Sequence, residues 1–328
     1  MNKFFFSILA VGAMVACTKS EVKYDDNASE ISFAPVATTA TKAAIDGNAY
    51  PTAIPFNVFS YYAVNVEPGQ VTNSWDSFTT LYLNNKKFAH NPAVNLFTGA
   101  EHSYYWPKTG SLVFAGYSPC VDMIESTSQS YTFADKLSIV GYVQSENTAV
   151  TDDLMWFDET DYSFRENVVP VTFKHACSWL SFYVHSNTPD ANFRIKKLVL
   201  NNVQVKGDFY TKVNPTWDLR YEEKKNVVVM DADVEVPSDA TQLQIDDNGV
   251  IVLPQPCVSA TITYTMDNGA GVVIEQTQTF DLSAGINGTN WLYSKHYIYT
   301  IQFSAAEIMI SPSVTDWDDV NGDMVVVD

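Results

Sequence analysis

The sequence of 328 residues predicts an all-β protein, and three observations support this fold class. Apolar and polar residues alternate with a period of two along several segments, as in strands with one buried face. Asp-Asn-Gly tripeptides, which favour tight turns, follow or precede some of these segments. No stretch of ten or more residues combines a 3.6-residue apolar period with helix caps. The length allows two domains, so we expect β-sandwiches in tandem.

The N-terminus has the organisation of an export signal. Lys3 precedes an apolar run at residues 4–15, which is shorter than a membrane-spanning helix. Small residues then lead directly into Cys17, an arrangement that resembles the lipobox of bacterial lipoproteins. We therefore expect residues 1–16 to be a lipoprotein signal peptide and Cys17 to be lipidated. An ordinary secretory signal followed by a chance cysteine is the alternative.

A polar, acidic tether is expected at residues 17–29, and the first sandwich domain at residues 30–166. Period-two alternation and short apolar runs predict strands in this domain. A single helical turn is expected at residues 94–97. The predicted strands lie at residues 31–35, 56–60, 112–117 and 154–157.

The second sandwich domain is expected at residues 167–328. Buried-type residues change parity between Phe173 and Leu180, which predicts a bulge or sharp bend between Lys174 and Trp179. Asp-Asn-Gly at residues 267–269 predicts a hairpin between two apolar runs. A further strand is expected at residues 297–303, where aromatic and aliphatic residues alternate with more polar ones.

Composition limits the possible partners. The net charge of −19 at pH 7 disfavours nucleic acid and anionic lipid head groups. No run after Cys17 approaches the ~18 apolar residues of a membrane helix, so attachment to a membrane would depend on the lipid. The other cysteines, Cys120, Cys177 and Cys257, are odd in number and widely spaced. We expect free thiols, although one pair among them stays open.

Motifs for catalysis and for metal binding are absent from the sequence. No two histidines have the helical i, i+4 spacing of a zinc protease, and there is no nucleophile elbow, P-loop or glycine-rich dinucleotide motif. The acidic residues at 246–249 and 316–322 do not fit the spacing of a calcium loop. We expect neither enzymatic activity nor a metal or cofactor, and we rank a glycosidase last among the alternatives.

Two aromatic clusters allow a second interpretation. Tyr61 and Tyr62, together with Tyr104, Tyr105 and Trp106, could form a platform on which sugars stack. Aromatic residues are also common in the cores and rims of sheets, and we favour this structural role. A surface glycan-binding lipoprotein therefore remains the alternative function.

The chain resembles the fimbrillin family, the Mfa-like type V pilins of Bacteroidetes. The similarity lies in the order and spacing of several short motifs along nearly the whole chain. They are the lipobox at Cys17, Ile31-Ser32-Phe33, Tyr105-Trp106-Pro107 with residues 112–119, Asp153-Leu154-Met155, residues 171–176, Leu253-Pro254-Gln255, residues 295–301, and residues 311–317.

The resemblance implies two sandwich domains of transthyretin-like topology and export as an outer-membrane lipoprotein precursor. It also implies that a surface protease removes the first strand, and that a strand of a neighbouring subunit fills the resulting groove. The removed strand would contain Ile31 and Phe33. Such a fibre of pilin subunits would support adhesion at the cell surface.

Processing of this chain should differ from that of its oral relatives, which are cut after arginine. The first arginine here is Arg165, whereas Lys42 is the basic residue of the small-residue segment after the first strand. We therefore expect a trypsin-like surface protease to cut between Lys42 and Ala43. The alternative is an uncleaved anchor or tip subunit in which Lys42 is an ordinary loop residue.

The C-terminus carries the candidate donor strand. Met324, Val325, Val326 and Val327 form an apolar run after an Asn-Gly turn signal. An unpaired run of this kind favours aggregation, whereas insertion into another copy or a related pilin subunit would cover it. The alternative is that this run completes its own domain.

Overall fold

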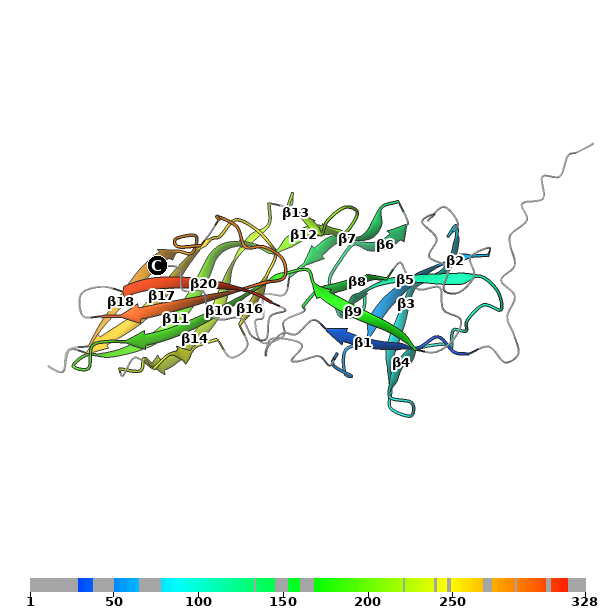
Figure 1. Cartoon of the computed structure of the whole chain (residues 1–328). Coiled ribbons are helices and arrows are strands. Elements are labelled where there is room, and N and C mark those ends of the chain that lie inside the picture. The colour runs from blue at the N-terminus through cyan, green and yellow to red at the C-terminus, as the bar shows by residue number, and fades with distance from the viewer. Residues whose placement is uncertain are drawn as a thin grey trace, which may run out of the picture.

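The computed structural model shows an elongated all-β molecule (Figure 1). All regular elements in the described residues are strands, which confirms the predicted fold class. In the described part of the chain, no helix is long and apolar enough to cross a membrane. The structure describes residues 29–37, 50–64, 78–132, 134–144, 153–159, 168–220, 222–238, 241–246, 249–267, 273–286, 288–304 and 308–317.

Seven strands form a closed barrel in the N-terminal part of the molecule. Around the barrel the order is β1-β4-β3-β2-β5-β8-β9. Closure depends on β1, because this strand lies between β4 and β9. The strands are β1 (Phe33–Ala37), β2 (Phe56–Ala63), β3 (Thr80–Asn91), β4 (Leu96–Gly99), β5 (Ser111–Ser118), β8 (Met155–Glu159) and β9 (Val169–His175).

A four-stranded sheet packs on the outside of the barrel. Its order is β13-β12-β7-β6, and it contains β6 (Ser128–Thr132), β7 (Lys136–Val143), β12 (Lys206–Tyr210) and β13 (Thr216–Asp218). Phe59 and Tyr117 of the barrel meet Leu137 and Phe209 of this sheet in one apolar cluster. Strand β5 is therefore buried on both faces, which explains why its apolar run is continuous rather than alternating.

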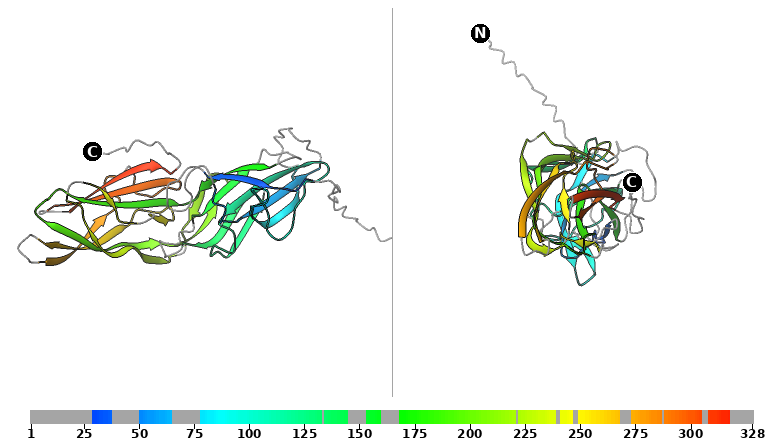
Figure 2. Two further views of the ribbon diagram at one scale, coloured as in Figure 1. Left: turned by 90° about the horizontal axis from the view of Figure 1, so that it is seen from below. Right: turned by 90° about the vertical axis from the view of Figure 1, so that its left-hand side faces the viewer.

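The C-terminal part is a sandwich of two sheets, seen end to end with the barrel in Figure 2. One sheet has the order β15-β10-β19-β20, with β16 also paired to β10, and the other has the order β14-β11-β17-β18. Leu180 and Tyr299 of the first sheet and Ile262 of the second belong to one core. The strands are β10 (Ser178–Ser186), β11 (Asn192–Gln204), β14 (Lys224–Glu235), β15 (Leu243–Gln244), β16 (Val250–Val252), β17 (Ser259–Asp267), β18 (Val273–Asp281), β19 (Lys295–Phe303) and β20 (Ile308–Asp316).

The predicted irregularity lies where the chain leaves the barrel. In β9 the buried residues are odd-numbered and include Val171 and Phe173, whereas Leu180 and Val184 in β10 are buried at even positions. Strand β9 ends at His175, and after two residues the chain enters a different sheet as β10. The parity change therefore marks the passage from barrel to sandwich. The predicted hairpin is confirmed by the antiparallel pairing of β17 with β18.

The division expected between residues 166 and 167 does not coincide with a change of sheet. Strand β9 follows this division but pairs with β1 and β8 in the barrel. Strands β12 and β13 also follow it, and they share a sheet with β6 and β7. Whether residues 30–166 and 167–328 fold as separate units stays a prediction. Residues 94–97, expected to form a helical turn, belong to the β3–β4 turn and the start of β4.

Candidate functional site

The segment that closes the barrel is held by backbone hydrogen bonds from several loops and strands. Trp106 N donates to the Ser29 carbonyl at 3.0 Å, and Ile31 N donates to the Tyr104 carbonyl at 2.7 Å. Val169 N donates to the Ser32 carbonyl at 2.8 Å, at the point where β1 begins to run beside β9. The first strand predicted from the sequence is therefore an integral part of the barrel.

Phe33 occupies the centre of the barrel core. Its side chain is fully buried, and its ring lies close to four phenylalanine rings. The ring centroids are 4.8 Å apart for Phe88, 5.3 Å for Phe114, 5.7 Å for Phe56 and 6.4 Å for Phe157. The first three contacts are edge-on, the arrangement that aromatic pairs favour. Since the four rings come from β3, β5, β2 and β8, one side chain of β1 connects most of the barrel.

The backbone ladder of β1 is weak compared with this packing. Strand β1 pairs with β9 in parallel over five residue pairs, and with β4 through Phe33 and Phe97 alone. Parallel pairing is slightly less stable per residue than antiparallel pairing. Since Val169 N donates to the Ser32 carbonyl, the even-numbered residues of β1 bond to β9, and Pro35 lacks its backbone donor on the β4 side, where pairing is limited to one residue pair. Strand β1 therefore depends mainly on its buried side chains, Phe33 and the preceding Ile31.

Tyr50 anchors the chain independently after β1. Its side chain is buried and stacks on Phe173 with the ring centroids 4.9 Å apart. Its hydroxyl lies 2.6 Å from the Ser118 hydroxyl. Residues 38–49 therefore connect two segments that are each fixed to the barrel on their own. Tyr50 and the four rings around Phe33 were not singled out from the sequence, because their proximity arises only through long-range strand pairing.

Most of the other site residues predicted from the sequence lie outside the described residues. These are Cys17, Lys42, Ala43, Met324, Val325, Val326 and Val327. The nearest described residues are Ser29 and Ala37 on the N-terminal side, and Trp317 before the C-terminal run. Of the predicted site residues, the structure thus places Ile31 and Phe33, and it brings both into the barrel core.

The aromatic platform is not assembled as a sugar-binding surface. Trp106 is 2% exposed and packs edge-on against Phe114 inside the barrel. Tyr62 is buried and donates its hydroxyl to the Thr109 carbonyl at 2.8 Å. Tyr105 is 43% exposed. The prediction that these aromatic residues fill the core is therefore confirmed for Trp106 and Tyr62.

Two histidines stack on tryptophans at the junction of barrel and sandwich. The His175 ring lies 4.0 Å from that of Trp317, and its Nδ1 lies 2.7 Å from a carboxylate oxygen of the buried Asp153. His296 stacks on Trp179 at 3.5 Å, and burial lowers the pKa of its imidazole to about 3. The described residues contain no group of three histidine, cysteine or acidic side chains arranged to hold a metal ion.

The thiols predicted to be free are unpaired in the structure. Burial raises the pKa of the Cys177 thiol well above its usual value, and the nearby Asp153 carboxylate raises it further. A thiol of this kind is a poor nucleophile at neutral pH. Cys120 is also buried, whereas Cys257 is partly buried. Cys177 therefore contributes to core packing rather than acting as a nucleophile at neutral pH.

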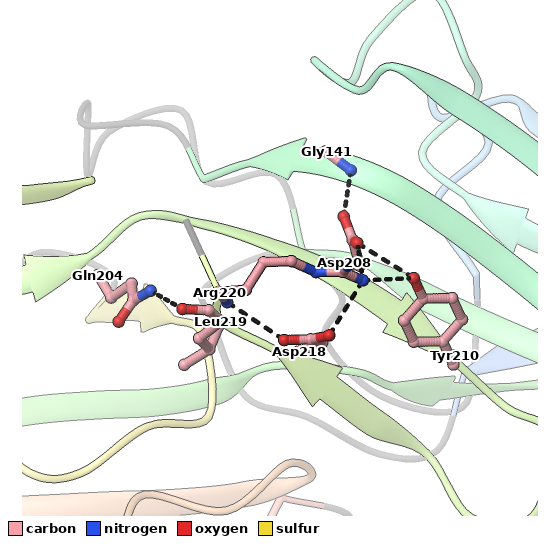
Figure 3. A network of polar contacts seen from close by, with 7 residues as sticks. All are labelled: Gly141, Gln204, Asp208, Tyr210, Asp218, Leu219 and Arg220. Atoms are coloured by element: carbon pink, nitrogen blue, oxygen red, sulfur yellow. Dashed lines mark hydrogen bonds and ion pairs between the residues drawn. The ribbon is translucent and has the colours of Figure 1, made fainter. Parts of the chain in front are cut away.

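A polar network links the sheet beside the barrel to the segment after β13 (Figure 3). The buried Asp208 carboxylate accepts a hydrogen bond from Gly141 N at 2.7 Å and another from the Tyr210 hydroxyl at 3.1 Å. Arg220 pairs with Asp208 at 2.8 Å and with Asp218 at 3.0 Å. Both oxygens of Asp208 are engaged, so the arrangement stabilises the β7–β12 contact rather than offering a free acid or base.

Comparison with known proteins identifies the family. The model of the fimbrillin-like family matches residues 41–317. A fimbrial protein from Bacteroides vulgatus is 11% identical, with a TM-score of 0.61 over 88% of this chain and 100% of that protein. A candidate cell adhesion protein from Bacteroides uniformis is 17% identical, with a TM-score of 0.52 over 88% of this chain and 99% of that protein. At these identities the two structures show a shared fold, and a comparison with curated sequences finds no significant match. Because the family model covers most of its length, this chain belongs to the fimbrillin-like family.

Proposed function

We propose that the chain is a structural pilin subunit of a type V fimbria, which polymerises by strand exchange after losing β1 and thereby supports adhesion. The position of β1 carries the proposal. This strand fills the centre of the barrel with one aromatic side chain, yet its backbone ladder with β9 is short and parallel, and its pairing with β4 is limited to one residue pair. A strand held in this way can be replaced by another that offers similar side chains and a better ladder.

Export and processing would proceed in two steps. A lipid on Cys17 would hold the precursor at the outer membrane, and a surface trypsin-like protease would then cut between Lys42 and Ala43. The cut would fall between Ala37, at the end of β1, and Tyr50. The new N-terminal segment would therefore stay fixed to the barrel through the contacts of Tyr50 with Phe173 and Ser118. The family match begins at residue 41, so nearly all of the family-defining part of the chain would survive this cut.

Loss of β1 would leave an open groove between β4 and β9. Both strands would gain an unpaired edge, and the rings around Phe33 would contact water. Such an edge beside an empty core position binds an added strand through backbone hydrogen bonds and a side-chain pocket. The groove therefore supplies both the driving force and the geometry for joining subunits.

The donated strand would come from the C-terminus of a neighbouring subunit, either another copy or a related pilin. Trp317 is buried at the junction, and 11 residues follow it up to residue 328. An extended segment of that length spans up to roughly 36–40 Å. Met324, Val325, Val326 and Val327 would form the apolar part of the donor. The glycan-binding alternative is not favoured, because Trp106 lies inside the barrel, where it is buried from solvent and from any sugar.

The proposal is tested by replacing the cleavage residue in the native cell. Lys42→Gln should reach the surface as a lipoprotein and should be missing from isolated fibres. Lys224→Gln, a change at an exposed lysine in β14, is the matched control and should be incorporated normally. Incorporation of the uncut Lys42→Gln protein into fibres would refute processing at this residue as the trigger for assembly.

A further inference from the structure

The groove under β1 has one dominant feature, a deep site for an aromatic ring. Phe33 reaches rings on four different strands, with centroid distances between 4.8 and 6.4 Å. A shorter side chain at this register, such as valine, would not extend to all four strands. It would leave a void lined by aromatic rings, and voids of this kind are costly because the lining atoms lose their contact partners.

The remainder of the segment adds one further requirement. Ile31 is fully buried, so a second apolar residue is needed two positions before the ring. Ala34 and Val36 are exposed, and Pro35 is partly exposed. The groove therefore recognises a strand by an aliphatic residue followed, two positions later, by an aromatic one.

Neither segment that the proposed processing and donation would free in a second copy meets this requirement. After a cut behind Lys42, the new N-terminal segment would be residues 43–49, which contain no aromatic residue. Residues 318–328 contain none either, and their apolar part is methionine and valine. Trp317, which precedes them, is buried against His175 and belongs to its own junction core.

We infer that the groove of this subunit accepts a strand from a different protein, one that presents phenylalanine, tyrosine or tryptophan at the register of Phe33. The inference rests on the proposed strand exchange and narrows it to assembly between unlike subunits. The C-terminal run of this chain would then be donated to a subunit whose groove suits small aliphatic side chains. A fibre built in this way would have a fixed order of subunits rather than being a homopolymer.

The test uses the full precursor chain with a site-specific protease sequence in place of residues 40–43. After the cut, the N-terminal segment is removed under denaturing conditions and the chain is refolded. A fluorescent peptide of residues 29–37 is then bound to the groove, and its anisotropy is followed. Three unlabelled peptides then compete with it: residues 29–37 with Phe33→Val, the same residues with Val36→Ser, and residues 318–328. The Val36→Ser peptide is the matched control, because Val36 is exposed.

We expect the Val36→Ser peptide to compete like the native peptide, and both the Phe33→Val and the 318–328 peptides to bind weaker by about tenfold or more. An excess of uncut chain, which has a filled groove and an intact C-terminus, should not displace the label. If residues 318–328 or the uncut chain compete as well as the native peptide, the requirement for a different protein is refuted while strand exchange stands. If the labelled native peptide itself does not bind, strand exchange fails, and this inference fails with it.

Discussion

At the scale of single residues, Asp208 shows how a buried carboxylate is stabilised in this molecule. Its side chain is 2% exposed, accepts a hydrogen bond from the Gly141 backbone N–H and forms an ion pair with Arg220. Asp208→Ala leaves a buried N–H without its acceptor, so we expect the free energy of unfolding to fall by about 1–3 kcal/mol in urea titrations. Asp218→Ala removes a half-exposed partner of the same arginine and should cost less than about 1 kcal/mol. Equal losses in the two variants would contradict this interpretation.

His296 predicts a pH dependence of stability. Its folded-state pKa of about 3 lies below the unfolded value of about 6.5, because burial disfavours the charged ring. Between these values the unfolded chain binds a proton that the folded chain does not. The contribution of His296 to stability is therefore complete above pH 6.5 and is lost as the pH falls, by at most about 1.4 kcal/mol per pH unit.

The corresponding measurement compares urea midpoints at neutral pH and near pH 4.5. Wild type should lose more stability over this interval than His296→Gln, which has no group that titrates at this position. The Ser181 hydroxyl, 2.9 Å from His296 Nε2, offers the glutamine a hydrogen-bond partner. The same pH dependence in both proteins would show that His296 does not titrate in this way.

At the scale of elements, β1 is stabilised mainly through Phe33. Phe33→Ala removes a ring that contacts four strands, so the uncut precursor should lose about 3–5 kcal/mol of unfolding free energy in urea titrations. Val36→Ala, at an exposed position of the same strand, serves as the control and should be nearly neutral. A loss below about 1 kcal/mol for Phe33→Ala would mean that the barrel closes around a smaller side chain, and that β1 is not the key element.

The positions of several strands could be predicted from the sequence, but the strands with which they pair could not. Alternation and turn residues predicted β1, β19 and the β17–β18 hairpin because these signals are local. The pairing of β1 with β9, about 135 residues later in the chain, has no local signal. For the same reason the sequence did not place β12 beside β7, nor did it gather the rings around Phe33. The burial of Trp106 also follows from the closed barrel rather than from its own segment.

At the scale of the whole molecule, the two ends of the chain have complementary roles in the proposed assembly. Deletion of residues 324–328 removes the candidate donor and leaves the described strands intact. We expect the truncated chain to be a folded monomer with an unchanged urea midpoint. Isolated fibres should show that it no longer joins to a next subunit, because it has no strand to donate. A large loss of stability would instead show that these residues complete their own domain.

The central claim is that the mature subunit has lost β1, and its most direct test is the N-terminus and intact mass of the protein in native fibres. We predict a chain that begins at Ala43 and carries no lipid. If the fibres contain only chains that begin at an acylated Cys17, with Ile31 and Phe33 retained, the subunit is a permanently tethered lipoprotein and the strand-exchange account is wrong.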